Sequence, residues 1–320
     1  MTRDVAGIAL FALAVVALTA WLQSGVWLNA LMMTLYAALL ALAWHLLGGF
    51  GGQFSFGHAL FFGTGAYASA IAQVTHGANA WAAFAAAIAG AGLVGAIVGA
   101  IVFRYGLKGS YFALVTLAFA EVARIVAVSV AFTGGGVGMM LPLHESAAHM
   151  QFGSRKGFIG VVLVCVVAAL LLASWVRHSR FGARLQAVRD NEDAARAVGV
   201  DPRRTKLLAT VLSAALTGAA GAFYLQVFQY IDPAIAFGPQ VSIEALVGAI
   251  VGGLGTLWGP VLGAAVLHAL AEGTRNLFGN VPGLNLVIYG SVLVLMVTFV
   301  PRGLAGSGRA LRAPWRKRRG

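Results

Sequence analysis

Charged side chains are scarce in this 320-residue sequence, since only 10% of its residues are Asp, Glu, Lys or Arg. Soluble domains contain roughly 25%, and residues 5–103 contain no charged residue. A soluble fold needs charge across its surface, so this scarcity excludes a soluble enzyme. Cysteine is nearly absent as well. The single Cys165 lies in an apolar run, which excludes a disulfide scaffold and a thiol metal site.

Apolar residues take the place of the missing charges, and they make up 60% of the sequence. A helix crosses a bilayer with roughly 20 apolar residues and satisfies its own backbone hydrogen bonds there. We therefore predict an all-α, polytopic integral membrane protein with about ten transmembrane helices in a single domain, 1–320. The apolar runs lie at 6–23, 28–47, 58–75, 80–103, 111–132, 157–176, 207–228, 241–254, 258–272 and 284–300.

The positive charge is concentrated rather than spread. Of the 22 Lys and Arg residues behind the formal charge of +12, eight fall in 177–206 and seven in 302–320. Such clusters mark cytoplasmic loops and contacts with the membrane lipid. We therefore predict a cytoplasmic loop at 177–206, a basic cytoplasmic tail at 302–320 and both chain termini in the cytoplasm. No nucleic-acid partner is expected.

Glycine and proline interrupt one apolar stretch at GGLGTLWGP, from Gly252 to Pro260. These residues break helices, so we expect two short helices to meet there and return the chain to its starting side. The total is then ten crossings. An inverted repeat of five plus five helices, common in transporters, is a further hypothesis. It aligns Phe56-Gly57 with Phe237-Gly238, but little else matches.

The loop 177–206 contains the signals of a short helix. Asp190 or Asn191 is suited to cap its N-terminus, and the Glu192-Asp193 pair then occupies the first turn, where negative charge is favoured. Gly199 is a natural C-cap. Asp201-Pro202 is typical of the start of the next helix.

This short helix has two interpretations. Ala194, Ala195 and Val198 make a small apolar face, which is suited to docking in a groove on another protein. Alternatively, the helix is simply solvated and its charges only hold the topology. Spacing alone does not decide between these interpretations.

A few polar residues fall inside the predicted spans, where ionisable groups are costly and often mark a transport path. Glu121 and Arg124 are spaced i,i+3 and pair on one helix face, which serves packing equally well. His58 follows one Phe-Gly step, and Glu244 follows the other. The candidate path residues are Phe56, Gly57, His58, Glu121, Glu244, Gly253 and Trp258.

No catalytic constellation is present, and the sequence contains no Gly-x-x-x-x-Gly-Lys-Ser/Thr phosphate loop. We therefore expect no enzyme activity and no cofactor on this chain. The histidines do not fall at the spacing of metal ligands. His144 and His149, five residues apart beside Glu145, would bind a metal only by chance, so no metal site is expected.

Four stretches resemble the membrane permeases of ABC importers for branched-chain amino acids, and the LivM-type subunit in particular. They are GGQFSFGHALFFGTGAY (51–67), LKGSYFALVTLAFAEVARI (107–125), SRFGARLQAVRDNEDAARAVGVDPRRTKLLATVLSAALTGAAG (179–221) and SIEALVGAIVGGLGTLWGPVLGA (242–264). The stretch 179–221 is highly specific for this family, and the stretch 107–125 is similar to the LivM type rather than to its LivH-type partner. Family members vary at the position of Gly238-Pro239-Gln240, so these residues do not identify the substrate.

The resemblance implies a permease subunit in a bacterial-type inner membrane. It would form a heterodimer with a LivH-like permease, with two ABC ATPase subunits below and an extracytoplasmic solute-binding protein above. ATP and Mg would bind to the ATPases. Segment 189–199 matches the family's coupling helix, and Glu192, Ala194, Ala195 and Gly199 would face the ATPase groove. The implied coupling residues are Arg189, Asn191, Glu192, Ala194, Ala195 and Gly199.

The function expected from the resemblance is import of branched-chain amino acids or of a related small polar solute such as urea or a short amide. A self-contained secondary transporter or channel that uses Glu121, Arg124 and Glu244 is the alternative. A membrane scaffold without transport activity is a third class, since the 42 glycines also suit close helix packing.

Overall fold

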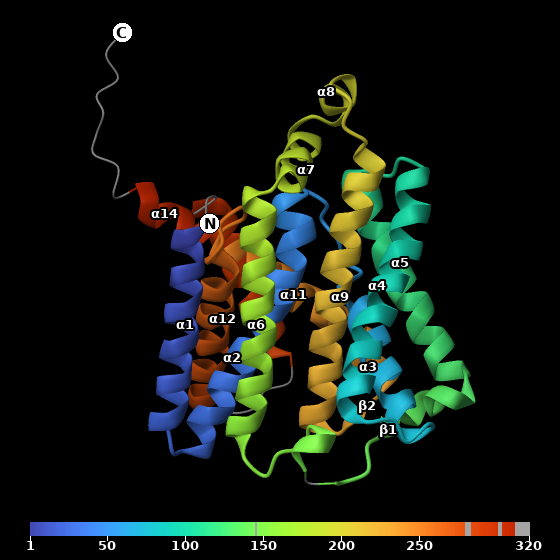
Figure 1. Cartoon of the computed structure of the whole chain (residues 1–320), viewed down its shortest axis with the longest axis vertical. Coiled ribbons are helices and arrows are strands. Elements are labelled where there is room, and N and C mark those ends of the chain that lie inside the picture. Colours follow the sequence, from blue (N-terminus) through green and yellow to red (C-terminus); the bar gives the residue numbers. More distant parts are fainter. Residues whose placement is uncertain (145, 279–282, 300–302, 311–320) are drawn as a thin grey trace.

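The computed structural model describes residues 1–144, 146–278, 283–299 and 303–310. These residues form an almost entirely helical bundle whose long helices run along one common axis (Figure 1). The predicted all-α polytopic fold is confirmed. In the predicted basic tail, 302 and 311–320 lie outside the described residues.

The helices follow one another along the chain, and the long connection 130–154 separates the fifth from the sixth. They are α1 (Thr2–Trp21), α2 (Gly25–His45), α3 (His58–Val74), α4 (Ala80–Arg104), α5 (Gly109–Ser129), α6 (Arg155–His178), α7 (Arg180–Asp190), α8 (Glu192–Ala197), α9 (Pro202–Phe228), α10 (Pro233–Phe237), α11 (Pro239–Gly252), α12 (Gly259–Phe278), α13 (Leu284–Phe299) and α14 (Gly303–Ala310). Single 3-10 turns lie at Ala131–Thr133, Gly135–Val137 and Ala147–His149. Strand β1 (Met139–Met140) pairs antiparallel with β2 (Tyr230–Ile231).

The number of full spans is smaller than predicted. Seven helical segments of the described residues are long and apolar enough to cross a membrane, against the ten expected. Helices α3 and α13 have 17 and 16 residues and fall short of the roughly 20 that a full span needs. Helix α12 has 20 residues but ends in a polar stretch with Glu272 and Arg275. Apolar composition alone does not separate such helices from full spans.

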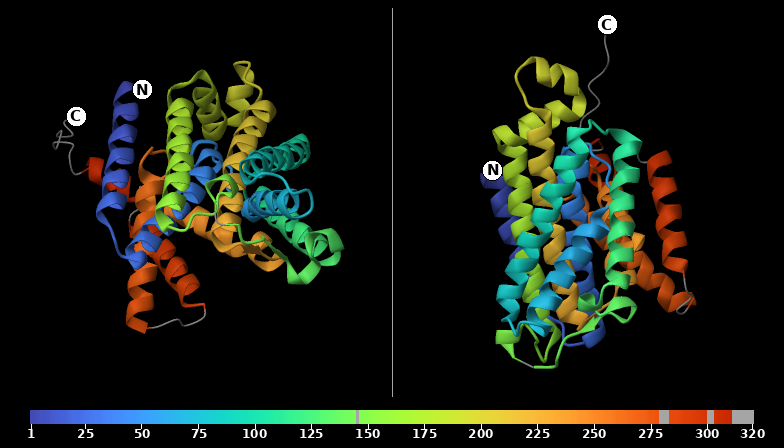
Figure 2. Two further views of the ribbon diagram at one scale, coloured as in Figure 1. Left: turned by 60° about the horizontal axis from the view of Figure 1, so that its bottom comes forward. Right: turned by 90° about the vertical axis from the view of Figure 1, so that its right-hand side faces the viewer.

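The two ends of the bundle carry different elements. Helices α7, α8 and α14 and the N-terminus lie at one end, called here the loop end (Figure 1). The β1–β2 pair lies at the opposite end, called the strand end. The Met1 amino group is 3.5 Å from Nε2 of His178, and Asp4 is 3.7 Å from Arg177. The N-terminus and the start of loop 177–206 therefore lie at the same end of the bundle (Figure 2), whereas the cytoplasmic location of this end stays a prediction.

Helix α9 is the centre of the bundle and packs closely on α3 and α4 through small residues. A Cβ built on Gly65 of α3 would lie 2.3 Å from the carbonyl oxygen of Gly218 in α9. A Cβ on Gly218 would in turn lie 2.3 Å from Cβ of Ala91 in α4. Backbones this close give van der Waals contact that replaces the weak hydrophobic drive between helices in lipid.

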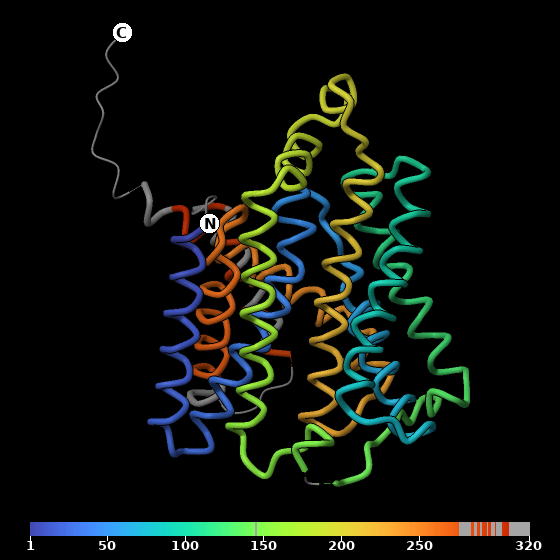
Figure 3. The backbone as a smooth tube through the Cα atoms, viewed as in Figure 1, coloured from blue at the N-terminus to red at the C-terminus, as the bar shows by residue number. Residues whose placement is uncertain are grey.

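The first interruption of a helix lies after α2. Its end continues as a π-helix at Leu46–Phe50, and residues 51–57 are not helical before α3 begins. The Trp44 ring Nε1 donates a hydrogen bond to the Ser55 carbonyl at 2.8 Å, so the chain folds back along α2. The tube in Figure 3 shows the same reversal. π-helical turns are rare and are frequently found at functional sites.

The second interruption lies where it was predicted, between Gly252 and Gly259. Helix α11 ends at Gly252, and Gly253 and Gly255 have φ values of +116° and +76°, which only glycine adopts readily. Helix α12 then packs back against α11. The two halves differ at the aligned Phe-Gly steps, since α3 begins after the irregular segment 51–57 whereas α11 begins directly after α10. The inverted repeat therefore stays a prediction.

Candidate functional site

The short helix α8 projects from the loop end and is capped as predicted (Figure 1). Asn191 Oδ1 accepts hydrogen bonds from the amides of Asp193 and Ala194, both at 3.0 Å. At the other end Gly199 has a φ of +84°, and its amide donates to the Arg196 carbonyl at 3.0 Å. The adjoining helices are capped too, since Asp201 Oδ1 accepts from the Arg203 amide at 2.9 Å.

The outward face of α8 differs from the predicted one. Ala195 is only 3% exposed, and the Glu192 side chain is 14% exposed, so both face this chain's own helices. The expectation that they face a partner groove is wrong, because positions i and i+3 share a helix face and two lysines hold Glu192 inward. Ala194 and Gly199 are exposed as expected, and Val198 is 79% exposed.

Arg189, at the end of α7, connects the loop to the interruption after α2. Its Nη1 donates to the Gly49 carbonyl at 3.2 Å, and its Nε donates to Asp190 at 3.1 Å. A Cβ on Gly52 would lie 2.4 Å from Cγ of Arg189, so the arginine stem also packs on the backbone there. Arg189 therefore joins α7 directly to the π-helix.

A buried junction forms where α3 begins. His58 Nε2 lies 2.9 Å from Oγ of Ser213 in α9, and this hydroxyl donates to the Ala43 carbonyl at 2.7 Å. The hydroxyl therefore accepts from the imidazole N–H, which fixes the histidine tautomer. The Ala59 amide donates to Oγ of Ser242 in α11 at 2.9 Å. The helices that follow the two predicted Phe-Gly steps thus meet through neutral hydrogen bonds.

Phe56 and Gly57 connect this junction to α5. A Cβ on Gly57 would lie 2.4 Å from the carbonyl oxygen of Thr116, and the Phe56 amide donates to Oγ1 of Thr116 at 3.3 Å. Beside them is an open apolar groove of about 570 Å³. It is lined by Phe54, Phe56, Gly109, Ser110, Ala113, Leu114 and Leu117.

The other candidate path residues lie apart from the junction. Glu121 sits on the exposed side of α5, where Arg124 Nε donates to it at 2.9 Å. Glu244 lines a small cavity of about 10 Å³ between α2, α11 and α12. Trp258 packs edge-to-face on Phe11 of α1, with ring centroids 5.6 Å apart, and its role in the path stays a prediction.

The fourth candidate, Gly253, ends α11 beside α14. A Cβ on Gly303 of α14 would lie 2.3 Å from Cα of Gly253. The structure therefore brings together Phe56, Gly57 and His58 and separates them from Glu121, Gly253 and Trp258.

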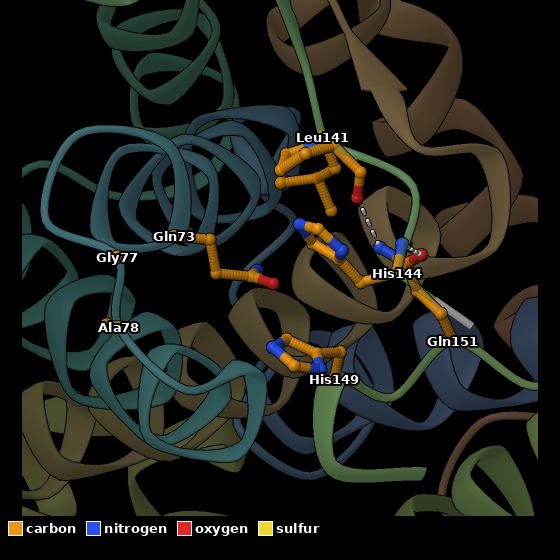
Figure 4. Close-up of a pocket in the computed structure, with 8 residues that line it drawn as sticks. Gln73, Gly77, Ala78, Leu141, His144, His149 and Gln151 are labelled. Carbon is orange, nitrogen blue, oxygen red and sulfur yellow. Dashed lines mark hydrogen bonds between the residues drawn. The ribbon is translucent and has the colours of Figure 1, made fainter. Parts of the chain in front are cut away.

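At the strand end a pocket of about 260 Å³ lies between α3 and the loop after β1 (Figure 4). The rings of His144 and His149 are 5.4 Å apart, and Gln151 Oε1 accepts from the His144 amide at 2.7 Å. Gln73 points toward both rings from α3. The described residues contain no group of three or more His, Cys, Asp or Glu side chains that could hold a metal ion.

Comparison with known proteins assigns the family. The family model of the permease component of branched-chain amino acid transport systems matches residues 26–297. This chain belongs to that family. It is 28% identical to the LivM permease of Escherichia coli K12 over 297 residues, which cover 85% of this chain and 68% of that protein.

More distant relatives include other permeases. LivH of the same bacterium is 25% identical over 84% of this chain and 91% of its own length. The L-arabinose ABC transporter permease AraH of Azospirillum brasilense is 26% identical over 74% of this chain and 68% of its own length. The chain is therefore a multi-pass ABC permease subunit, and ATP hydrolysis belongs to separate subunits.

The candidate site has two connected parts, namely the α7–α8 loop and the junction at the start of α3. Sequence analysis did not identify Ser213, Ser242 and Thr116, which hold the junction. A serine in an Ala-rich helix has no sequence pattern that marks it as a functional residue. Lys108 and Lys206 were also missed as loop contacts, although a lysine that interrupts or borders an apolar run is a recognisable signal.

Proposed function

We propose that this permease forms half of the translocation path of an ABC importer and that α8 docks on a separate ATPase subunit. The capped α8, projecting at the loop end with Val198 79% exposed, is the observation that carries the proposal. A short rigid helix with exposed small residues fits a groove on another protein. The loop end is then cytoplasmic, with the N-terminus there as well.

A second permease subunit, similar to LivH, would pack on the apolar groove beside Phe54, Phe56 and α5. This groove supports the proposal because exposed apolar patches of this kind mark interfaces or ligand grooves. ATP and Mg would bind to two ATPase subunits at the loop end. A solute-binding protein would deliver the solute at the strand end, where the loop after β1 is held in place.

The proposed substrate is a branched-chain amino acid or a related small polar solute. LivM and LivH are named for branched-chain amino acids, whereas AraH is named for L-arabinose. Relatives with one fold thus differ in substrate, which supports selection of the solute by the binding protein.

In the proposed mechanism, closure of the ATPases displaces α8 and α7. Arg189 passes this movement to the backbone of Gly49 and Gly52, at the π-helix and just after it. The irregular segment 51–57 leads from there to the start of α3, where His58 is bonded to Ser213. Rearrangement of this junction between α3, α9 and α11 opens and closes the path.

The test uses the complete complex with both permeases and both ATPases in proteoliposomes. Val198→Asp places a charge on the docking face, so we expect solute-stimulated ATP hydrolysis and ATP-driven uptake to fall about tenfold or more. Val198→Ala keeps the face small and apolar and serves as the control. Normal coupled uptake by Val198→Asp contradicts the proposal.

Uptake by the permease alone in ATP-free vesicles, driven by an ion gradient, would instead support a secondary transporter. Glu121 and Arg124 form their own pair on an exposed face, so we expect no such uptake.

A further inference from the structure

Three cationic groups converge on the carboxylate of Glu192 in α8. Lys206 Nζ lies 2.6 Å from Oε2, and Lys108 Nζ lies 3.2 Å from the same oxygen. Arg196 Nη2 lies 3.3 Å from Oε1. Arg196 belongs to α8 itself, whereas Lys108 immediately precedes α5 and Lys206 lies early in α9. One carboxylate thus joins α8 to two spanning helices.

The pair between Glu192 and Lys206 is shielded from solvent. The Lys206 side chain is 5% exposed, and its ammonium lies 5.7 Å from the centroid of the Phe103 ring. Phe103 in turn stacks on Phe112, with centroids 5.5 Å apart. A charge pair away from water is stronger than one in bulk solvent, and removal of one partner leaves the other charge uncompensated.

Glu192 is ionised in this setting. Burial raises its pKa, but the hydrogen bonds and charges of Lys206 and Lys108 outweigh burial and hold the pKa below the usual value. Both carboxylate oxygens contact this chain's own cations, and the side chain is only 14% exposed, whereas Ala194 and Val198 are exposed.

We propose that Glu192 acts as a positioning residue and, with Lys206 and Lys108, forms an ion clamp that makes α8 move together with α5 and α9. This inference rests on the proposed docking of an ATPase on α8. The clamp matters for coupling because both spanning helices contact the junction. Helix α5 carries Thr116, which holds Phe56, and α9 carries Ser213, which bonds to His58. A displacement of α8 therefore reaches the junction from both sides, in addition to the contact made by Arg189.

An ordinary surface salt bridge contributes little and depends on salt. Arg196 provides the matched control for that case, because it contacts the same carboxylate at 3.3 Å with its side chain 59% exposed. If the clamp positions α8, Lys206→Met must have a large effect and Arg196→Gln a small one. If Glu192 is only a solvated charge, the two variants must behave alike.

The first experiment measures amide hydrogen exchange of α8 in the full purified chain, without ATPase subunits. We expect exchange at residues 193–198 to be about tenfold faster in Lys206→Met than in wild type, and within about twofold of wild type in Arg196→Gln. Glu192→Gln/Lys206→Met removes both charges of the shielded pair together, so that neither is left uncompensated. Exchange in this double variant as slow as in wild type overturns the clamp.

The second experiment measures the ratio of ATP hydrolysed to solute imported in the assembled complex. We expect this ratio to rise about fivefold or more in Glu192→Gln/Lys206→Met, while the ATPases still copurify. A wild-type ratio in the double variant overturns the inference. Absence of ATP-driven uptake in the wild-type complex would defeat the proposed function instead, and the exchange experiment would still decide whether the clamp exists.

Discussion

The loop end and the buried junction are both well ordered, but they use opposite chemistry. In the α7–α8 loop, order comes from helix caps and from charges, with Glu192 bound to Lys206 at 2.6 Å. At the junction no ion pair occurs among the described residues, and order comes from neutral hydrogen bonds such as His58 to Ser213 at 2.9 Å and from glycine contacts. The first region projects from one end of the bundle, whereas the second is buried among apolar helices.

This difference indicates how the contacts of each region respond when the region is displaced. Charge pairs at a surface exchange readily with water and salt. The exposed pair of Arg196 with Asp193 is therefore suited to remaking contacts with a partner, whereas the shielded pair of Glu192 with Lys206 stays within this chain. Buried neutral hydrogen bonds and backbone contacts have few alternative partners, so the junction is suited to two discrete arrangements rather than gradual change.

The largest effect is expected from a glycine at the junction. Gly57→Val adds a side chain where even a Cβ would lie 2.4 Å from the Thr116 carbonyl oxygen. The resulting overpacking should lower the free energy of unfolding by about 3 kcal/mol, measured by denaturant titration in micelles. Gly160→Val in α6 is the control, because a Cβ there meets no described atom within 4 Å. Equal losses for both variants would remove the packing argument.

A smaller effect is expected from the hydroxyl that joins His58 to α2. Ser213→Ala leaves the buried His58 Nε2 and the Ala43 carbonyl without their partner. The expected loss is about 2 kcal/mol of stability, with reduced uptake by the assembled complex. Thr217→Ala, one turn further along α9, removes a buried hydroxyl that bonds only to the Ser213 carbonyl at 2.8 Å. It should cost clearly less, and an equal loss would show that the junction has no special dependence on Ser213.

Sequence reasoning succeeded where structure depends on near neighbours. The caps at Asn191, Gly199 and Asp201 are local, since each side chain or backbone group bonds within a few residues of itself. The interruption at Gly252–Gly259 is local as well, because four glycines and a proline within nine residues disfavour a continuous helix there.

It failed where the partner is distant in sequence. Glu192 faces inward because it pairs with Lys206, 14 residues further along the chain, and with Lys108, which immediately precedes α5. Helix α3 was taken for a full span because the irregular segment 51–57 before it contains no charged residue to mark it. These outcomes depend on tertiary packing, which neither composition nor periodicity specifies.

The smallest predicted effect concerns the cap of α8 and tests whether loop order is local. Asn191→Ala removes the acceptor for the amides of Asp193 and Ala194. A lost cap costs about 1 kcal/mol, so exchange of the α8 amides should quicken about fivefold, while the stability of the junction stays unchanged. Ser154→Ala removes a comparable cap from α6 at the strand end, where Ser154 Oγ accepts from the Lys156 amide at 3.3 Å. It should leave α8 exchange at the wild-type rate. If Asn191→Ala also quickened amide exchange in α3 and α9, the loop and the junction would unfold as one cooperative unit. The two regions would then differ in the chemistry of their contacts but would not be independent of each other.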